Sequence, residues 1–212
     1  MTLSSRRGSW RTARFVAVDV ETTGLDPRRD EIISFAAVPV EEGRVAFGRT
    51  VSGLVRPRVA LPAKSIEIHG LRAADLEAAP SAPEALAPLA AALDDCIPIA
   101  HAAWVERAFL APPLGQLGTS LPRKIVDTAV LWRLLCLDRG GDDPGWCSLA
   151  TLADALGVPS HRPHEAEGDA LTTAQVFLAL ATHLERHGRS TPAALAGAQR
   201  RVRGWALWHP PG

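Results

Sequence analysis

Asp19 and Glu21 are two acidic residues at the end of the apolar stretch FVAVDVETTGL, residues 15–25. Residues 15–20 are apolar apart from Asp19, which predicts a strand buried on both faces. Side chains alternate along a strand, so both carboxylates would project from one face, with their positions roughly 6.6 Å apart. Such a pair is repulsive and costly to bury, and a divalent cation removes both penalties. The pair indicates a metal site; the alternative is two solvated acids before a turn.

A second acidic segment, PHEAEGDALTTAQVFLAL at residues 163–180, offers a further carboxylate in Asp169. One helical stripe would contain Leu171, Ala174, Phe177 and Leu178. On one continuous helix His164 and Asp169 would point about 140° apart. They converge only if His164 lies in the loop before the helix, a boundary that Pro163 favours. Taken singly, His164 fits an exposed loop imidazole and Asp169 a charge that complements a helix N-terminus.

The elements that must position these residues follow a strand-rich and then a helix-rich order. Strands are expected over residues 15–20, 31–40 and 45–55, with a hairpin turn at 41–43, and over 97–100. Helices are expected over residues 83–93, 105–110, 126–137, 149–156, about 165–183, and 192–201. Strands followed by helices mixed with further strands predict an α/β fold, a mixed sheet flanked by helices.

Length, charge and cysteine content bound the class of protein. The chain has 212 residues, which suits one domain with a sizeable core. Its 23 Lys and Arg balance 23 Asp and Glu, so a polyanion would have to be held locally, through metals, a few Arg side chains or backbone N–H groups. Three cysteines without a CxxC pair are typical of a reducing cytosol and argue against a zinc ribbon. No signal peptide or membrane span is visible, so we expect a cytoplasmic protein without membrane contact.

Two motifs resemble those of a known enzyme family. The stretch VDVETTGL at residues 18–25 resembles the first motif of the DEDDh 3′-5′ exonucleases, the DnaQ-like family of the proofreading epsilon subunit of bacterial DNA polymerase III. HEAEGD at 164–169 is similar to the third motif, His-x-Ala-x-x-Asp. Supporting segments follow in the expected order: IHGL at 68–71, VDT at 126–128 and SLATL at 148–152. The resemblance covers about residues 14–183.

The resemblance implies a ribonuclease-H-like fold, with a mixed five-stranded sheet flanked by helices, and hydrolysis of phosphodiester bonds at 3′ ends by a two-metal mechanism. Asp19, Glu21 and Asp169 would hold two divalent cations, Mg²⁺ or Mn²⁺, with Asp19 bridging them. His164 would act as the general base that takes the proton from the attacking water.

The resemblance also implies where the substrate binds. The turn of Thr22, Thr23 and Gly24 would hold the terminal nucleotide, and Leu25 would wedge against its base. His69, in the IHGL segment, would lie near that base, or would be a hydrogen-bonded structural histidine instead.

The second motif departs from the family pattern His-Asn-Ala-x-Phe-Asp. The matching residues 101–106 read HAAWVE, so the fourth carboxylate is Glu106 and the Asn is replaced by Ala102. In the family this carboxylate commonly acts through metal-bound water, so the outer shell could absorb one extra methylene. Disruption of such geometry typically costs about 10–100-fold in affinity or activity. Asp94 and Asp95 are acidic alternatives, although they precede the strand.

Other side chains carry weaker signals. His161 and His164 have the HxxH spacing of a zinc site, but no further ligand falls at a matching spacing. Trp205 and Trp208, in the tail RVRGWALWHPPG, could anchor a protein partner or stack on nucleic acid; the alternative is docking on the chain's own surface.

Three functions remain open from the sequence. The first is a 3′-5′ exonuclease that acts on single-stranded or frayed DNA ends, and the second is an RNA or oligoribonucleotide exonuclease with the same chemistry. The third is a nucleic-acid-binding or polymerase-associated module whose hydrolysis is weakened at Glu106 and Ala102. The sequence does not specify the sugar, a polymerase partner bound through the C-terminal tail, or the oligomeric state. The expected division is a basic tail at 1–13, an exonuclease domain at 14–190, and a C-terminal helix and Trp-containing tail at 191–212.

Overall fold

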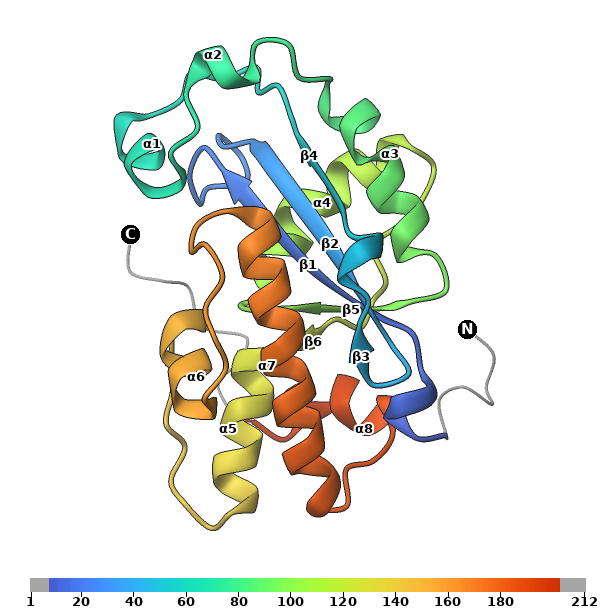
Figure 1. Ribbon diagram of the computed structural model, residues 1–212. Helices are drawn as coiled ribbons and strands as arrows, with labels where there is room; N and C mark the ends of the chain where they lie inside the picture. The colour runs from blue at the N-terminus through green and yellow to red at the C-terminus, as the bar shows by residue number, and fades with distance from the viewer. Residues whose placement is uncertain (1–7, 203–212) are drawn as a thin grey trace.

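A mixed sheet forms the centre of residues 8–202, the part of the chain that the computed structural model describes (Figure 1). Its strands are β1 (Phe15–Thr22), β2 (Ile32–Glu41), β3 (Arg44–Val45), β4 (Val51–Leu54), β5 (Ile97–Ala100) and β6 (Val126–Asp127). The strand order is β3-β2-β1-β5-β6, and β4 also pairs with β2. β1 is antiparallel to β2, whereas β1, β5 and β6 run parallel. The C-terminal ends of these three strands therefore meet at one edge of the sheet.

The expected single strand over residues 45–55 is wrong, because a 3-10 turn, η2 (Phe47–Arg49), divides it. β3 pairs with the end of β2 at Val40, and β4 pairs with its middle at residues 34–37. The Thr50 hydroxyl donates to the carbonyl of Phe47 at 2.7 Å, which stabilises the turn. β3 and β4 thus share one position beside β2, so six strands fill five positions. The expected hairpin turn is confirmed, with positive φ at Glu42 and Gly43.

Eight α-helices surround the sheet in the described residues. They are α1 (Ala63–His69), α2 (Ala73–Leu76), α3 (Ala82–Leu93), α4 (Trp104–Gln116), α5 (Thr128–Asp138), α6 (Leu149–Leu156), α7 (Ala166–Arg186) and α8 (Pro192–Ala196). The expected helix over 126–137 begins two residues late, because Val126 and Asp127 extend the sheet as β6. The helix expected over 192–201 ends at Ala196, and the short helices α1 and α2 were not expected.

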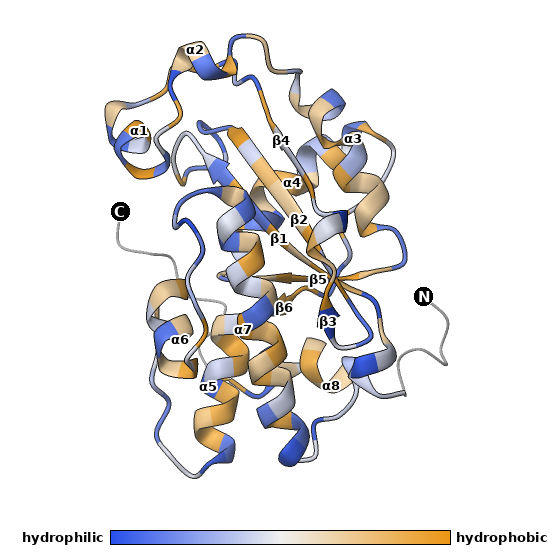
Figure 2. Ribbon diagram, in the orientation of Figure 1, coloured by the Kyte–Doolittle hydropathy of each residue, from blue (hydrophilic) through white to orange (hydrophobic). Residues whose placement is uncertain are grey.

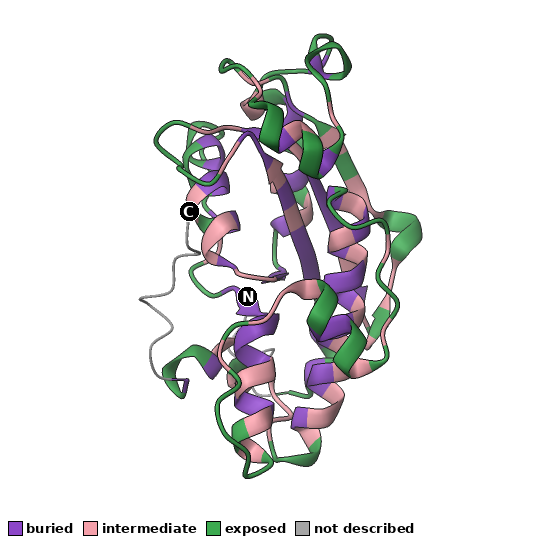
Figure 3. Cartoon of the chain, turned by 90° about the vertical axis from the view of Figure 1, so that its left-hand side faces the viewer, coloured by how far each residue is buried: buried purple, intermediate pink, exposed green. Residues whose placement is uncertain are grey.

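Two apolar cores lie on opposite faces of the sheet. Phe15 and Ala17 of β1 face the core formed with α5, α6 and α7, whereas Val16 and Val18 face the core formed with α3 and α4. Strands β1, β2, β5 and β6 are apolar and buried along most of their length, whereas β3 and β4 are partly exposed (Figures 2 and 3). This alternation confirms a strand buried on both faces and places Asp19, with the parity of Phe15, on the α7 side.

Trp10 closes the first of these cores near the N-terminal end of the described residues. It lies in a 3-10 turn, η1 (Trp10–Thr12), and is 1% exposed. Its ring meets that of Phe177 edge-on with centroids 5.9 Å apart, and Phe177 lies 4.7 Å from Phe15. Part of the expected basic tail thus packs on the domain. No helix within residues 8–202 has the length and apolar character that crossing a membrane requires.

Phe177 joins α7 to β1, so we expect Phe177→Ala to lower the free energy of unfolding by about 3–5 kcal/mol. Urea denaturation measures this change. The matched control is Leu137→Ala on α5, where the side chain is 39% exposed and the loss should stay below about 1 kcal/mol. Equal losses for the two variants would contradict the assignment of Phe177 to the core.

Candidate active site

Three carboxylates meet at the C-terminal end of β1. Asp19 and Glu21 project from that strand, and Asp169 from the first turn of α7, which packs on β1 and β2. One oxygen from each of the three carboxylates lies within 4.8 Å of the others. The structure therefore brings together the three residues that the sequence predicts as metal ligands.

Burial and mutual repulsion disfavour the charged forms of these carboxylates. Burial, then Glu106, Glu21 and Asp169, raise the pKa of Asp19 well above its usual range. Burial and then Asp169 raise the pKa of Glu21 to about 7. The pKa of Asp169 is raised by burial, although an N–H from His164 opposes the shift. Cations would relieve both causes, so this donor set fits hard divalent ions.

Glu106, the predicted fourth carboxylate, lies in the first turn of α4 and is 3% exposed. Its Oε2 atom has no hydrogen-bond partner among the described residues. Burial raises the pKa of Glu106, and the charges of Asp127 and Glu21 raise it further. Glu106 therefore adjoins the carboxylate cluster with an unsatisfied buried oxygen. The alternatives Asp94 and Asp95 follow α3 and are not members of the three-carboxylate group.

Asp127 fixes the start of the helix that carries Glu106. Its Oδ2 accepts from the Ala103 N–H at 2.9 Å, and its Oδ1 accepts from the Ala129 N–H at 2.9 Å. One buried side chain thus ties the start of α4 to the N-terminus of α5. Burial raises its pKa to about 6, against the effect of these N–H donors. The sequence marked this residue only as part of a supporting segment and assigned it no role.

His101 follows β5 and stabilises the loop between α5 and α6, which contains Cys147. Its Nδ1 lies 2.9 Å from the Thr128 hydroxyl, and its Nε2 lies 3.0 Å from the Cys147 carbonyl. Burial lowers the pKa of His101 to about 4, so the ring is neutral near pH 7. The next residue, Ala102, stands where the family has Asn and has φ of 60°, a conformation that Asn tolerates better than Ala.

His164 lies in the loop before α7, as the sequence predicts, and is exposed. Its φ is 64°, and its N–H donates to Asp169 Oδ2 at 2.9 Å. The loop packs on the helix at Gly168, where an added Cβ would lie 2.1 Å from the His161 carbonyl oxygen. His161 itself bonds to Gln175 of α7 and belongs to no metal-binding group among the described residues, which argues against the HxxH zinc site.

The predicted substrate-binding turn is built around Asp30, which the sequence did not reveal. Thr23 donates its hydroxyl to Asp30 Oδ1 at 2.9 Å, and a Cβ on Gly24 would lie 2.5 Å from the same carboxylate. The Thr22 hydroxyl donates to the Gly24 carbonyl at 2.6 Å. Both hydroxyl protons thus have internal acceptors, whereas the Leu25 side chain is 53% exposed.

A cleft of about 500 Å³ extends from Glu21, one of the three carboxylates, to β4. It is bounded by Glu21, by the loop before α7, and by the end of α1 at His69. His69 is 8% exposed, and its Nδ1 accepts from the Leu71 N–H at 3.0 Å, so Nε2 carries the ring proton. That Nε2 has no acceptor among the described residues. Burial lowers the pKa of His69, which keeps the ring neutral.

Comparison with known proteins identifies the family. A family model described as Exonuclease (RNase_T) matches residues 16–177. The chain belongs to this exonuclease family. The DNA polymerase III PolC-type protein of Thermotoga petrophila is 33% identical over 181 residues, which are 85% of this chain and 13% of that protein. The DNA polymerase III subunit epsilon-like protein of Rhodobacter capsulatus is 32% identical over 184 residues, 85% of this chain and 25% of that protein.

Solved structures agree on the fold of the exonuclease domain. Exonuclease X, solved with 5′ overhanging duplex DNA, has a TM-score of 0.67 at 22% identity, with 87% of this chain and 98% of that chain covered. Exonuclease I of E. coli, solved with a dT13 oligonucleotide, has a TM-score of 0.70 at 15% identity. The match covers 82% of this chain and 42% of the Exonuclease I chain. The predicted DnaQ-like family and ribonuclease-H-like fold are confirmed. The chain spans only 13% and 25% of the two sequence relatives above.

Gly168→Ala should displace the loop that carries His164, because the new methyl group would overlap the His161 carbonyl. We expect a loss of about 1–3 kcal/mol in unfolding free energy and at least tenfold in activity. Gly115→Ala in α4 is the matched control, since nothing lies within 4 Å of its added Cβ and Ala favours helix. Denaturation and rate measurements that rank the two variants equally would contradict the close contact.

The raised pKa of Glu21 predicts how metal-free stability depends on pH. Its pKa rises from 4.5 to about 7 on folding, so the folded chain binds this proton more tightly than the unfolded chain. The resulting stability is complete below pH 4.5 and is lost as pH rises to 7, by about 2 kcal/mol after allowance for partial exposure.

Glu21→Gln imitates the protonated side chain and tests this sign. In EDTA at pH 7.5 the variant should melt at a higher temperature than the native chain, and excess Mg²⁺ or Mn²⁺ should reverse that order. The control, Glu77→Gln, changes an exposed residue of the same type and should alter neither result. A Glu21→Gln variant whose melting temperature in EDTA depends on pH between 5 and 7 just as that of the native chain does would refute the electrostatic account of Glu21.

Proposed function

We propose that this chain is a metal-dependent 3′-5′ exonuclease that removes nucleotides from single-stranded or frayed DNA ends. The observation that carries the proposal is the meeting of Asp19, Glu21 and Asp169 within 4.8 Å, beside the buried and unpartnered oxygen of Glu106. Four acidic groups at one sheet edge have no stabilising role in an apolar core, because their charged forms repel. They fit a site that concentrates positive charge on a phosphodiester.

Asp19, Glu21 and Asp169 would hold the divalent ions, Mg²⁺ or Mn²⁺. Bound ions would neutralise charge on the phosphate and lower the pKa of water at this site. Glu106 would orient the outer shell, since its carboxylate adjoins Glu21 and Asp19. Glu has one methylene more than Asp, and this length is compatible with such a role. The bond from the Ala103 N–H to Asp127 fixes the start of α4, and with it the position of the Glu106 backbone.

His164 would accept the proton of the attacking water. Its imidazole is exposed beside the cleft, and its backbone is held by the bond to Asp169. A rigid loop keeps a general base at a constant distance from the site, which proton transfer requires. The loop's close contact with Gly168 contributes this rigidity.

The terminal nucleotide would lie between the Thr22–Leu25 turn and His69. Leu25 offers an exposed apolar side chain to the base, and His69 offers the Nε2 proton that has no acceptor among the described residues. Because the hydroxyl protons of Thr22 and Thr23 have internal acceptors, these residues would shape the turn, and Gly24 would leave room for the strand.

DNA is preferred over RNA in this proposal because the sequence relatives are named as DNA polymerase III proteins. Association with a polymerase, and location in the cytoplasm, are proposed on the same ground. Trp205 and Trp208, which the sequence offers as anchors for a partner, lie outside the described residues. The alternative of a weakened binding module depends on Ala102 and Glu106 in the second motif.

Asp19→Asn is expected to lower hydrolysis of 5′-labelled single-stranded DNA at least a thousandfold, because it removes the carboxylate on which Glu106, Glu21 and Asp169 all act. The native chain should produce a ladder only with Mg²⁺ or Mn²⁺. Glu106→Gln should reduce the rate about 10–100-fold, and Glu106→Asp should retain more activity than Glu106→Gln. Matched DNA and RNA oligomers give the sugar preference in the same assay.

Leu137→Ala, on the exposed side of α5, serves as the control for handling and folding of these variants. Near-normal hydrolysis by Asp19→Asn would overturn the mechanism. Strand binding without any ladder, on DNA or RNA, would favour the binding-module alternative.

A further inference from the structure

Arg162 is the only Arg or Lys among the described residues that line the cleft. Glu21, Glu165 and Glu167 line the same cleft, so its walls are mainly acidic. The chain has no net charge, so no overall positive field draws a polyanion toward this site. Apart from metal ions, Arg162 is the one cationic group within these walls that could meet a phosphate.

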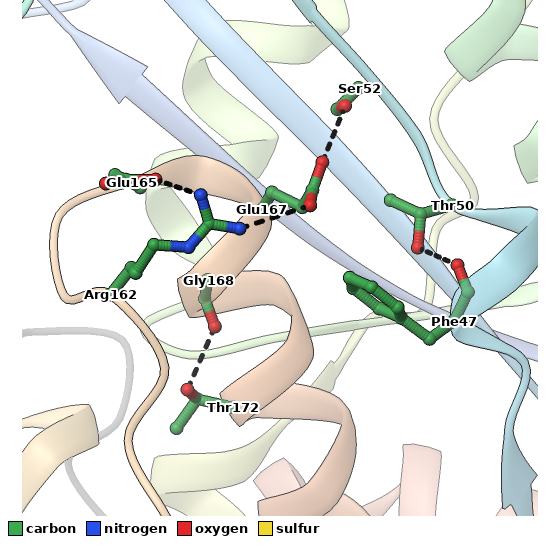
Figure 4. A network of polar contacts seen from close by, with 8 residues as sticks. All are labelled: Phe47, Thr50, Ser52, Arg162, Glu165, Glu167, Gly168 and Thr172. Carbon is green, nitrogen blue, oxygen red and sulfur yellow. Dashed lines mark hydrogen bonds and ion pairs between the residues drawn. The ribbon is translucent and has the colours of Figure 1, made fainter.

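The guanidinium of Arg162 is held by two carboxylates of α7 and its N-cap (Figure 4). Nη1 lies 2.9 Å from Glu165 Oε2, and Nη2 lies 3.5 Å from Glu167 Oε1. The other oxygen of Glu167 accepts from the Ser52 hydroxyl on β4 at 3.0 Å. A chain of polar contacts thus runs from the loop before α7 to the edge of the sheet.

These ion pairs are suited to exchange. The side chain of Arg162 is 63% exposed, and those of Glu165 and Glu167 are 51% and 35% exposed. Ion pairs this exposed contribute little to stability, so another anion can replace them without unfolding the loop. A phosphate accepts two parallel hydrogen bonds from a guanidinium, which single contacts to two separate carboxylates do not match.

The backbone beneath Arg162 is fixed, so the exchange needs only side-chain rotation. An added Cβ on Gly168 would lie 2.5 Å from the Arg162 carbonyl oxygen, which shows how closely the loop packs on α7. The His161 N–H donates to the Thr172 hydroxyl at 3.0 Å, and the His164 N–H donates to Asp169. Arg162 lies between these two anchored residues.

We propose that Arg162 binds a phosphate of the nucleic-acid strand, and that Glu165 and Glu167 hold its guanidinium until that phosphate displaces them. The inference rests on the proposed function, because it names a substrate contact of the same cleft. Arg162 and Glu167 then act in opposite directions on strand binding. A purely structural latch between the loop and β4 would instead make both residues act in the same direction.

Steady-state hydrolysis of a 5′-labelled DNA strand with saturating metal separates these two roles. Arg162→Gln should raise KM roughly fivefold or more, since it removes a charged hydrogen bond to phosphate, and kcat should change less than twofold. The slope of log affinity against log salt should become shallower by about 0.7, the value for one phosphate on a single strand. Glu167→Gln should lower KM, because it removes the competing anion.

Arg11→Gln provides the matched control. Arg11 pairs with Glu185 at 2.9 Å, is 45% exposed and lies at the N-terminal end of the described residues, away from the cleft. Its loss should change neither KM nor the salt slope. Arg162→Lys should preserve the salt slope while KM stays above that of the native chain, because Lys keeps the charge without the planar fork.

Failure of this inference can be told from failure of the proposed function. A native chain that hydrolyses DNA, with KM and salt slope unchanged in Arg162→Gln, refutes the phosphate contact alone. A fall in kcat of similar size in Arg162→Gln and Glu167→Gln, with KM unchanged, also refutes it and indicates a latch. If the native chain hydrolyses nothing, fluorescence anisotropy of a labelled strand with metal tests the same variants, and equal affinities for native and Arg162→Gln overturn the contact.

Discussion

Repulsion among partly buried carboxylates at the C-terminal end of β1 is the interaction on which the rest of the site depends. Asp19 and Glu21 belong to β1, and the apolar residues of this strand are packed into the two cores. The two carboxylates therefore cannot move away from each other. Asp169 adds a third negative charge from α7. Burial and proximity together make the metal-free, fully ionised cluster unfavourable, as the raised pKa values of all three groups indicate. Such a cluster persists only where the surrounding fold holds it in place, and bound cations would stabilise it by neutralising its charge.

The parallel arrangement of β1, β5 and β6 explains how the fold holds groups that repel. Their C-terminal ends meet at one edge, where Asp19 follows the core of β1, His101 follows β5, and Asp127 ends β6. The buried carboxylate of Asp127 accepts hydrogen bonds from backbone N–H groups at the starts of α4 and α5. Glu106 is thereby held against the cluster by a residue that is itself acidic. Backbone N–H groups satisfy Asp127, whereas one oxygen of Glu106 has no partner within residues 8–202.

Local sequence patterns were sufficient to predict the positions of residues that follow the period of a strand or a helix. The alternation of residues 15–21 predicted that Asp19 and Glu21 share a face, and Pro163 predicted the loop that frees His164 from the helix. β6 escaped prediction because it has only two residues, Val126 and Asp127, and leads directly into α5, so that both were assigned to the helix. Asp30 and Gly168 act through contacts within a loop, with residues a few positions earlier in the chain, and no strand or helix period reveals such contacts. Only the unfavourable choice of Gly in a first helical turn hinted at the role of Gly168. Glu106 was identified through family resemblance, since one acidic residue at a helix start has no distinctive period.

An exonuclease without net charge must recognise a polyanionic strand locally, and we propose that the cleft does so through charges that compete with one another. In the proposed function its acidic walls would repel a strand until metal ions are bound, which would make strand binding conditional on the presence of the groups that assist hydrolysis. Arg162, neutralised by Glu165 and Glu167 in the free chain, adds little long-range attraction. It becomes available only when a phosphate is near enough to replace those partners. Affinity in this cleft would therefore rise with metal occupancy rather than with net charge, so that a strand bound tightly is also one positioned for cleavage.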